Sequence, residues 1–187
     1  YLFLSTIFIL IWNNLRQKDH IHCKIPNLAQ IRDNQNLIDT NKDMNLKEKL
    51  KNKITTTGSW LTFNDPAVAE VMAKAGFDWL TIDLEHSCIN IKQAEELIRT
   101  IDLCGVTPLV RLTSNNADLT KRVLDAGAKG IIVPMVKSLS DAKNAINAAY
   151  YPPKGNRSFG LSRAQGYGTK FEEYLKVSYE ETIVILQ

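Results

Sequence analysis

Two acids, an imidazole and a hydroxyl follow directly on an apolar run in the stretch from Phe77 to Ser87. The run is rich in apolar and β-branched residues, which is typical of a buried strand. Asp83, Glu85 and His86 come together where it ends. An imidazole titrates near neutral pH and serves as a general acid or base, and a carboxylate can orient it. The stretch predicts an active-site strand of an α/β barrel; a strand that merely ends in a polar loop is the alternative.

Other predicted strands also end in residues with useful chemistry. Trp60 follows the first strand, Arg111 ends the third, and Gln187 stands near the end of the fifth. Since the carboxyl ends of parallel barrel strands share one rim, we expect these side chains to lie near His86. A guanidinium such as that of Arg111 can bind a carboxylate through two parallel hydrogen bonds or stabilise an enolate. For His86 and Arg111 a purely structural role, in a local hydrogen bond or an ion pair, stays open.

Alternating strand and helix patterns position these residues. Glycines that stop the helices (Gly76, Gly105 and Gly127) punctuate the alternation, and Asp65-Pro66 marks a helix start. The predicted strands are Thr55–Phe63, Phe77–Leu84, Thr107–Leu112, Gly130–Val133 and Thr182–Gln187. The predicted helices are Leu46–Lys53, Pro66–Ala75, Ile91–Cys104, Ala117–Ala126, one capped by Ser140 and running to Tyr150, and Phe171–Tyr179. Repeated βαβ units predict a parallel sheet, and the missing glycine-rich phosphate motifs argue against a nucleotide fold. The expected fold is an α/β (β/α)₈ TIM barrel, truncated after about the fifth strand.

Composition narrows the classes of function. The chain has 187 residues, enough for one domain with a sizeable core, and its net charge of +3 includes no basic block that would indicate nucleic acid. Cys23, Cys88 and Cys104 lack metal-ligand spacing, so a reducing compartment, the cytoplasm, is expected. Residues 1–43 form an apolar and then polar leader that we place outside the functional domain at 44–187; its apolar start is too short to span a bilayer.

The motifs together are similar to one known family. They run in order from about Leu46 to Gln187 and resemble the HpcH/HpaI aldolase family. The matching segments are Gly58–Leu61, Ala75–Trp79, Asp83–His86, Leu109–Arg111, Asp125–Ala128, Val133–Val136 and Tyr151–Arg157. The resemblance implies a class II, metal-dependent aldolase, an aldehyde-lyase that cleaves 4-hydroxy-2-oxo acids to pyruvate or a close analogue and an aldehyde.

The resemblance also implies roles for individual residues. His86 matches the acid/base, Arg111 the residue that steadies the enolate oxygen, and Asp125 the aspartate credited with raising the basicity of the histidine. Position alone argues otherwise for Asp125, because a helix end that precedes a strand faces the opposite rim; Asp83 is the alternative partner of His86. The expected substrate contacts are Gln187, Trp60, Glu85 and Arg157, the last in a loop from Gly155 to Gly168 that the resemblance places at the substrate rim.

The cofactor and partners follow from the same resemblance. It implies a divalent metal ion (Mg, Mn or Co) held by a glutamate and an aspartate beyond Gln187, so we expect no metal ligand in the chain as given and no activity from it. A small oxo-acid substrate and a homo-oligomer at full length are expected, with no nucleic-acid or membrane partner. Two alternatives stay open: a catalytically silent, barrel-derived binding protein, and a citryl- or malyl-thioester lyase on the same barrel.

Overall fold

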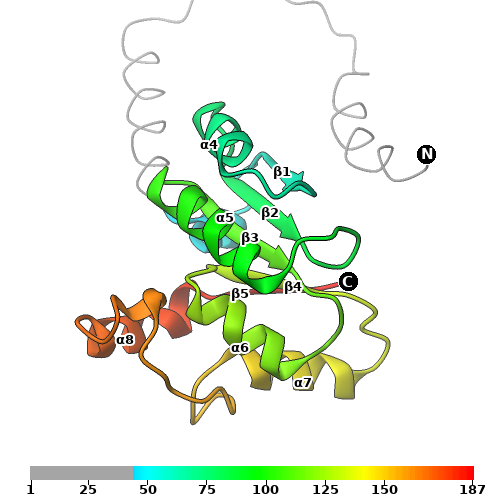
Figure 1. The fold of residues 1–187 in the computed structure, drawn as a ribbon. Coiled ribbons are helices and arrows are strands. Elements are labelled where there is room, and N and C mark those ends of the chain that lie inside the picture. The colour runs from blue at the N-terminus through cyan, green and yellow to red at the C-terminus, as the bar shows by residue number, and fades with distance from the viewer. Residues whose placement is uncertain (1–43) are drawn as a thin grey trace, which may run out of the picture. The chain divides into compact units, whose positions relative to one another are not determined.

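Five parallel strands form one sheet in the computed structural model, which describes residues 44–187. The strands are β1 (Gly58–Leu61), β2 (Trp79–Asp83), β3 (Thr107–Arg111), β4 (Gly130–Val133) and β5 (Ile183–Leu186), in the order β1-β2-β3-β4-β5. The helices are α3 (Leu46–Lys51), α4 (Pro66–Lys74), α5 (Ile91–Leu103), α6 (Ala117–Asp125), α7 (Leu139–Ala149) and α8 (Phe171–Glu181), with a 3₁₀ turn η1 (Arg163–Gln165). Sequential parallel neighbours joined by helices make part of a (β/α)₈ barrel, which confirms the predicted α/β fold (Figure 1).

Local sequence signals explain where the helices begin and end. The Asp65 side chain caps α4 by accepting a hydrogen bond from the Ala67 amide, and Pro66 is the first helical residue, as predicted. Gly76, Gly105 and Gly127 adopt φ values of +92°, +78° and +107° after α4, α5 and α6. These left-handed conformations are strained for residues with a Cβ, which is why glycine ends these helices.

Some predicted boundaries need correction. The cap of α7 is Ser138 rather than Ser140, because its hydroxyl accepts from the Asp141 amide. The predicted first strand is longer than β1. At its start, the Thr57 amide donates a hydrogen bond to the Asp78 carboxylate, and β1 begins one residue later. The turn η1 was not predicted.

Two groups of apolar residues cover the two faces of the sheet. The main core lies between the sheet and the helices and includes Leu80, Ile82 and Val110. On the other face Leu46 of α3 packs with Leu109 and Ile183. Successive strand residues point to opposite faces, so this second group marks the inner, barrel-side face.

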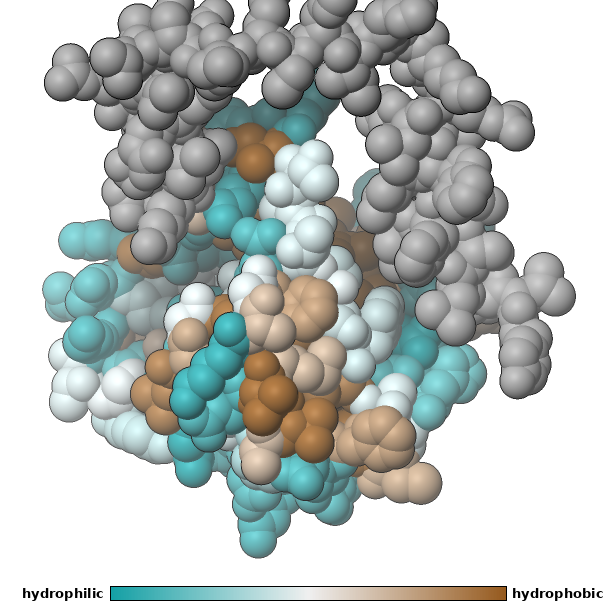
Figure 2. All heavy atoms as spheres, turned by 90° about the horizontal axis from the view of Figure 1, so that it is seen from above, coloured by the Kyte–Doolittle hydropathy of each residue, from teal (hydrophilic) through white to brown (hydrophobic). Residues whose placement is uncertain are grey.

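The edge of the sheet at β1 and α4 carries exposed apolar side chains. Phe63 is 71% exposed and Val71 is 70% exposed. Viewed from above, brown apolar side chains lie among teal polar ones (Figure 2). Within residues 44–187 no helix has the length and apolar character that crossing a bilayer requires. The leader, with its short apolar start, falls outside the described residues.

Candidate active site

The inner face of the sheet brings the candidate residues together. Asp83 of β2 is directly opposite Arg111 of β3, and Trp60 of β1 is level with Thr81, one step earlier on the same face. Gln187 follows Ile185 by two positions and so shares this face at the end of β5. Parallel strands thus place these side chains from β1, β2, β3 and β5 on one face, towards the carboxyl end of the sheet, as the sequence predicts.

Arg111 is the centre of the site. Its Nε and Nη2 atoms donate to the two oxygens of Asp83 at 2.9 and 2.6 Å, and its Nη1 lies 3.2 Å from Oε2 of Glu85. The indole of Trp60 stacks on the guanidinium, with 4.7 Å between Arg111 Cζ and the ring centroid. The hydrogen bonds that Arg111 donates to the Asp83 carboxylate raise the pKa of Arg111 above its ordinary value. The guanidinium is therefore charged and fixed in orientation.

Asp83 organises the loop that follows β2. Its Oδ1 accepts the backbone amides of Glu85 and His86 at 3.0 and 3.2 Å as well as Arg111 Nε. A short acid that accepts amides two and three residues ahead makes a tight turn, and that local pattern is a signal visible in the sequence. Asp83 is 3% exposed, so the turn is anchored in the protein interior.

Acid should weaken the fold through Asp83. Burial opposes ionisation, but hydrogen bonds from Arg111 and from the amides of His86 and Glu85 more than compensate and lower the pKa of Asp83. A lowered folded-state pKa gives stability that is present above the unfolded pKa of about 3.9 and lost as the pH falls through the folded value. We expect urea unfolding to show a free energy that drops below about pH 4, and Asp83→Asn to flatten that drop. An equal drop in the variant would contradict this.

His86 extends from the anchored turn into solvent. Its side chain is 71% exposed, and its Nε2 lies 3.8 Å from Oε2 of Glu85. Among the described residues Glu85 is the carboxylate within 4 Å of the imidazole. Asp83 binds the His86 backbone amide instead, so the expectation that Asp83 orients the ring does not match this geometry.

Gln187 is held at the rim by its backbone. Its amide donates to the Val133 carbonyl at 2.9 Å, and its carbonyl accepts from the Val136 amide at 2.9 Å. The residue is exposed, on the face that carries Arg111. The placement is compatible with the predicted substrate contact.

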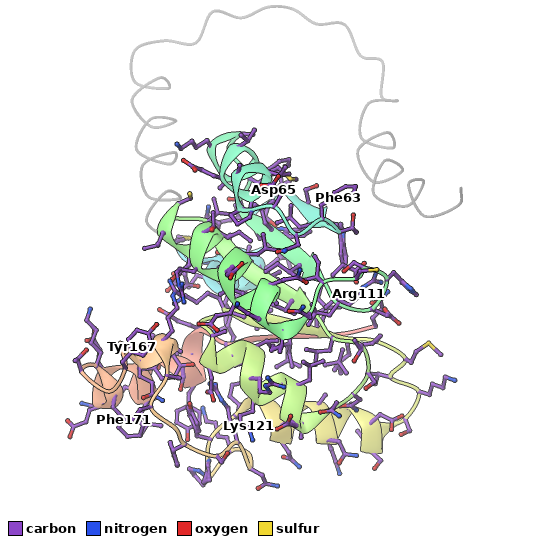
Figure 3. All side chains as sticks on the ribbon, in the orientation of Figure 1. Phe63, Asp65, Arg111, Lys121, Tyr167 and Phe171 are labelled. Atoms are coloured by element: carbon purple, nitrogen blue, oxygen red, sulfur yellow. The ribbon has the colours of Figure 1, made fainter. Side chains whose placement is uncertain are left out.

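Asp125 and Arg157 lie away from the rim. For Asp125 this agrees with the argument from its position and differs from the role that the resemblance implies, and for Arg157 it differs from the predicted substrate contact. Arg157 Nη2 lies 2.5 Å from Oδ1 of Asp125, Nη1 donates to the Tyr174 hydroxyl at 3.3 Å, and the guanidinium stacks on Tyr151 at 4.5 Å. The helix α6 runs opposite to the strands, so its last residue, Asp125, faces the end where the strands begin. Figure 3 shows Arg111 at the right, beside the strand tips, and Tyr167, from the Gly155–Gly168 loop, at the left, near α8.

Thr81 is a residue that the sequence analysis missed. It lies on the inner face beside Trp60, is 0% exposed, and its Oγ1 has no hydrogen-bond partner among the described residues. The alternation of faces along β2, counted back from Asp83, would have found it. A hydroxyl left in this state costs stability.

Thr81→Val should therefore raise the free energy of unfolding, by about 1 kcal/mol. Thr120→Val is the matched control, because Thr120 is 1% exposed but its hydroxyl donates to the Asn116 carbonyl at 2.9 Å. The control should lose about 1 kcal/mol in the same urea titration. Destabilisation of both variants would mean that the Thr81 hydroxyl has a partner.

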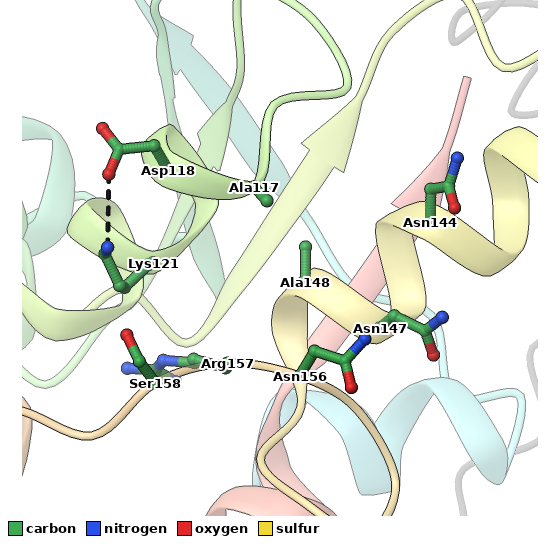
Figure 4. A pocket seen from close by; sticks show the side chains of 9 residues that line it. All are labelled: Ala117, Asp118, Lys121, Asn144, Asn147, Ala148, Asn156, Arg157 and Ser158. Carbon is green, nitrogen blue, oxygen red and sulfur yellow. Dashed lines mark ion pairs between the residues drawn. The ribbon is translucent and has the colours of Figure 1, made fainter.

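A hollow of about 400 Å³ lies between α6, α7 and residues 156–158 (Figure 4). Of the predicted site residues it is lined by Arg157 alone. In residues 44–187 no three His, Cys, Asp or Glu side chains gather to hold a metal ion. The nearest candidates, Asp83 and Glu85, are both bound to Arg111, so the described residues do not by themselves fit the divalent ion that the resemblance implies.

The fold and the rim define part of a (β/α)₈ barrel with polar side chains at the carboxyl ends of its strands, and comparison with known proteins gives the family. The family model "HpcH/HpaI aldolase/citrate lyase" matches residues 56–187. This chain therefore belongs to the HpcH/HpaI family.

Curated relatives and a solved structure agree with that assignment. A 2-dehydro-3,6-dideoxy-6-sulfogluconate aldolase of Pseudomonas putida is 36% identical over 139 residues, covering 74% of this chain and 54% of the relative. A 4-hydroxy-2-oxo-heptane-1,7-dioate aldolase of Salmonella typhimurium is 36% identical over 143 residues, with 75% and 54% covered. A crystal structure of a family member from Burkholderia cenocepacia aligns with a TM-score of 0.71 and 31% identity, covering 77% of this chain and 59% of that one. The chain spans about half the length of the curated relatives it matches.

Proposed function

We propose that this chain is the oxo-acid-handling part of a class II pyruvate-type aldolase, an aldehyde-lyase that acts on 4-hydroxy-2-oxo acids. The observation that carries the proposal is the convergence of Trp60, Asp83, Glu85, His86 and Arg111 on one rim. The names of the aldolase relatives support the reaction class.

The proposed chemistry assigns two steps to the side chains of this chain. His86 takes the proton of the C4 hydroxyl as the C3–C4 bond breaks, which releases the aldehyde and leaves an enolate of the three-carbon oxo acid. Arg111, fixed by Asp83 and Trp60, binds the carboxylate and the enolate oxygen through the N–H groups that the two acids leave free. Return of the proton to C3 gives pyruvate. A divalent ion, implied by the resemblance, would add further charge stabilisation to the enolate.

The test measures oxo-acid binding on the full 187-residue chain, and proton exchange on this chain joined to the C-terminal half of a family relative, because residues 44–187 do not by themselves fit a divalent ion. Pyruvate and oxalate should bind by calorimetry, and NMR in D₂O with Mg²⁺, Mn²⁺ or Co²⁺ should show loss of the pyruvate methyl protons, because enolate formation exchanges them. His86→Ala should slow exchange by on the order of a hundredfold while it leaves pyruvate binding within a few-fold. Exchange that is insensitive to His86 would remove it from the mechanism, and absence of any oxo-acid binding would overturn the proposal.

The exchange assay and a cleavage assay separate the alternatives. A silent binding protein would bind pyruvate but would not exchange its methyl protons, whichever metal ion is added. This alternative needs the test because Asp83 and Glu85 both pair with Arg111. A citryl- or malyl-thioester lyase would cleave thioesters in preference to free 4-hydroxy-2-oxo acids. We also propose the cytoplasm as the compartment, since Cys88 and Cys104 are both free thiols.

A further inference from the structure

The carboxyl end of β4 carries a β-bulge that contains Met135. Continued by one step, the pairing of β4 with β5 would place Pro134 beside Gln187 and let the Met135 amide donate to the Gln187 carbonyl. That carbonyl accepts the Val136 amide instead, at 2.9 Å, so two residues at the end of β4 lie opposite one residue of β5. Bulges of this kind occur beside active sites, where they redirect a side chain.

The bulge holds Met135 in a conformation that is unfavourable for its residue type. Its φ is +58°, in the left-handed region, where a Cβ comes too close to the following carbonyl oxygen. Among the described residues Lys53 and Tyr167 share this region, but each follows a helical turn, where one left-handed residue is ordinary. Met135 follows a strand, and its side chain is 66% exposed, so little burial compensates the cost. Such an uncompensated conformation indicates a functional position.

The extra residue also determines on which side of the sheet Met135 lies. Val133 is fully buried in the core between the sheet and the helices, and Val136 packs against the same core. Met135 lies between these two valines in the chain and is exposed, so its thioether lies outside that core. Since β4 lies next to β3 in the sheet, Arg111 has the loop of His86 on one side and Met135 on the other.

On the basis of the proposed function, we propose that Met135 selects the substituent on C3 of the oxo acid. Arg111 holds the carboxylate and the enolate oxygen, and His86 acts at C4 from the loop after β2. The remaining substituent of C3 points away from C4, and therefore away from β2 and towards the end of β4. A methionine side chain is apolar and adaptable, so it accepts a hydrogen or a methyl group there. It leaves a hydroxyl without a hydrogen-bond partner, so pyruvate and 2-oxobutanoate are preferred to hydroxypyruvate.

The experiment compares the affinities for pyruvate and hydroxypyruvate by calorimetry on the full 187-residue chain. The wild-type protein should bind pyruvate about tenfold more tightly, because the extra hydroxyl loses hydrogen bonds to water against an apolar side chain. Met135→Asn supplies a polar group and tolerates a positive φ, so the ratio of the two affinities should fall below about twofold.

Two further variants serve as controls. Met135→Leu keeps an apolar side chain and should keep the tenfold ratio. Leu103→Asn removes another exposed apolar side chain, 76% exposed, at the last residue of α5. The helices run opposite to the strands, so Leu103 lies towards the end where the strands begin, and its replacement should leave the ratio unchanged. Urea unfolding of Met135→Asn should show a midpoint equal to that of the wild type or higher, because asparagine suits the left-handed region.

Four results would overturn the inference while pyruvate binding keeps the proposed function standing. These are equal affinities in the wild type, a ratio that survives in Met135→Asn, a ratio that falls equally in Met135→Leu or Leu103→Asn, and a lowered urea midpoint in Met135→Asn, which would make Met135 a structural residue. Absence of binding of either oxo acid to the wild-type protein would overturn the proposed function itself.

Discussion

Arg111→Met should lower the free energy of unfolding by about 3–5 kcal/mol and abolish oxo-acid binding. The substitution leaves the Asp83 carboxylate, 4% exposed, without its bidentate partner and removes the ion from beneath the Trp60 ring. A buried charge that loses its partner keeps the cost of desolvation without the compensating attraction. Urea titration at pH 7 measures the loss.

The control for this prediction is Arg99→Met. Arg99 makes the same kind of ion pair with Glu95, but both side chains are more than 40% exposed on α5. Such exposed pairs contribute about 0–1 kcal/mol, so the control should stay close to wild type. A loss below about 1 kcal/mol for Arg111→Met would mean that Asp83 finds solvent or another partner.

Arg157→Met should also cost about 3–5 kcal/mol, although Arg157 lies far from the rim. Its side chain is 0% exposed, and it joins Asp125 on α6 to Tyr174 on α8 while it stacks on Tyr151. Burial raises the pKa of Tyr151 to about 12, so this phenol stays neutral, and a tyrosine has no positive charge that could replace the guanidinium beside Asp125. The expected result is a less stable protein that binds pyruvate with wild-type affinity wherever it is folded.

That result would separate two roles for Arg157. The family resemblance predicts a substrate contact, which would weaken pyruvate binding and spare the fold. Arg122→Met, an exposed position one turn before Asp125, serves as the control and should alter neither quantity by much. Weakened pyruvate binding with unchanged stability would return Arg157 to the substrate site.

Much of the fold could be read from local signals, because those signals act locally. Asp65-Pro66 and the glycines at 76, 105 and 127 fix helix ends through cap geometry and positive φ, and both depend on neighbouring backbone alone. The choice of Ser138 over Ser140 was missed because both serines suit a helix start. A local pattern separates them, because Ser138 is followed three residues later by Asp141, as at a typical helix start, whereas Ser140 is followed at that spacing by Lys143.

The sequence by itself determined that Trp60, Asp83, Glu85, His86 and Arg111 would meet at one rim. Strand periodicity and the parallel order force this, since residues at the carboxyl ends of neighbouring strands share an edge. Only the tertiary structure decided which acid holds which base. Two backbone amides and Arg111 hold Asp83 in the interior, so Glu85 is the carboxylate that lies near His86. Asp125 lies at the opposite end of the sheet, where it pairs with Arg157. Pairing of charges depends on a few ångströms between side chains from different elements, and residue types along one chain do not specify those distances.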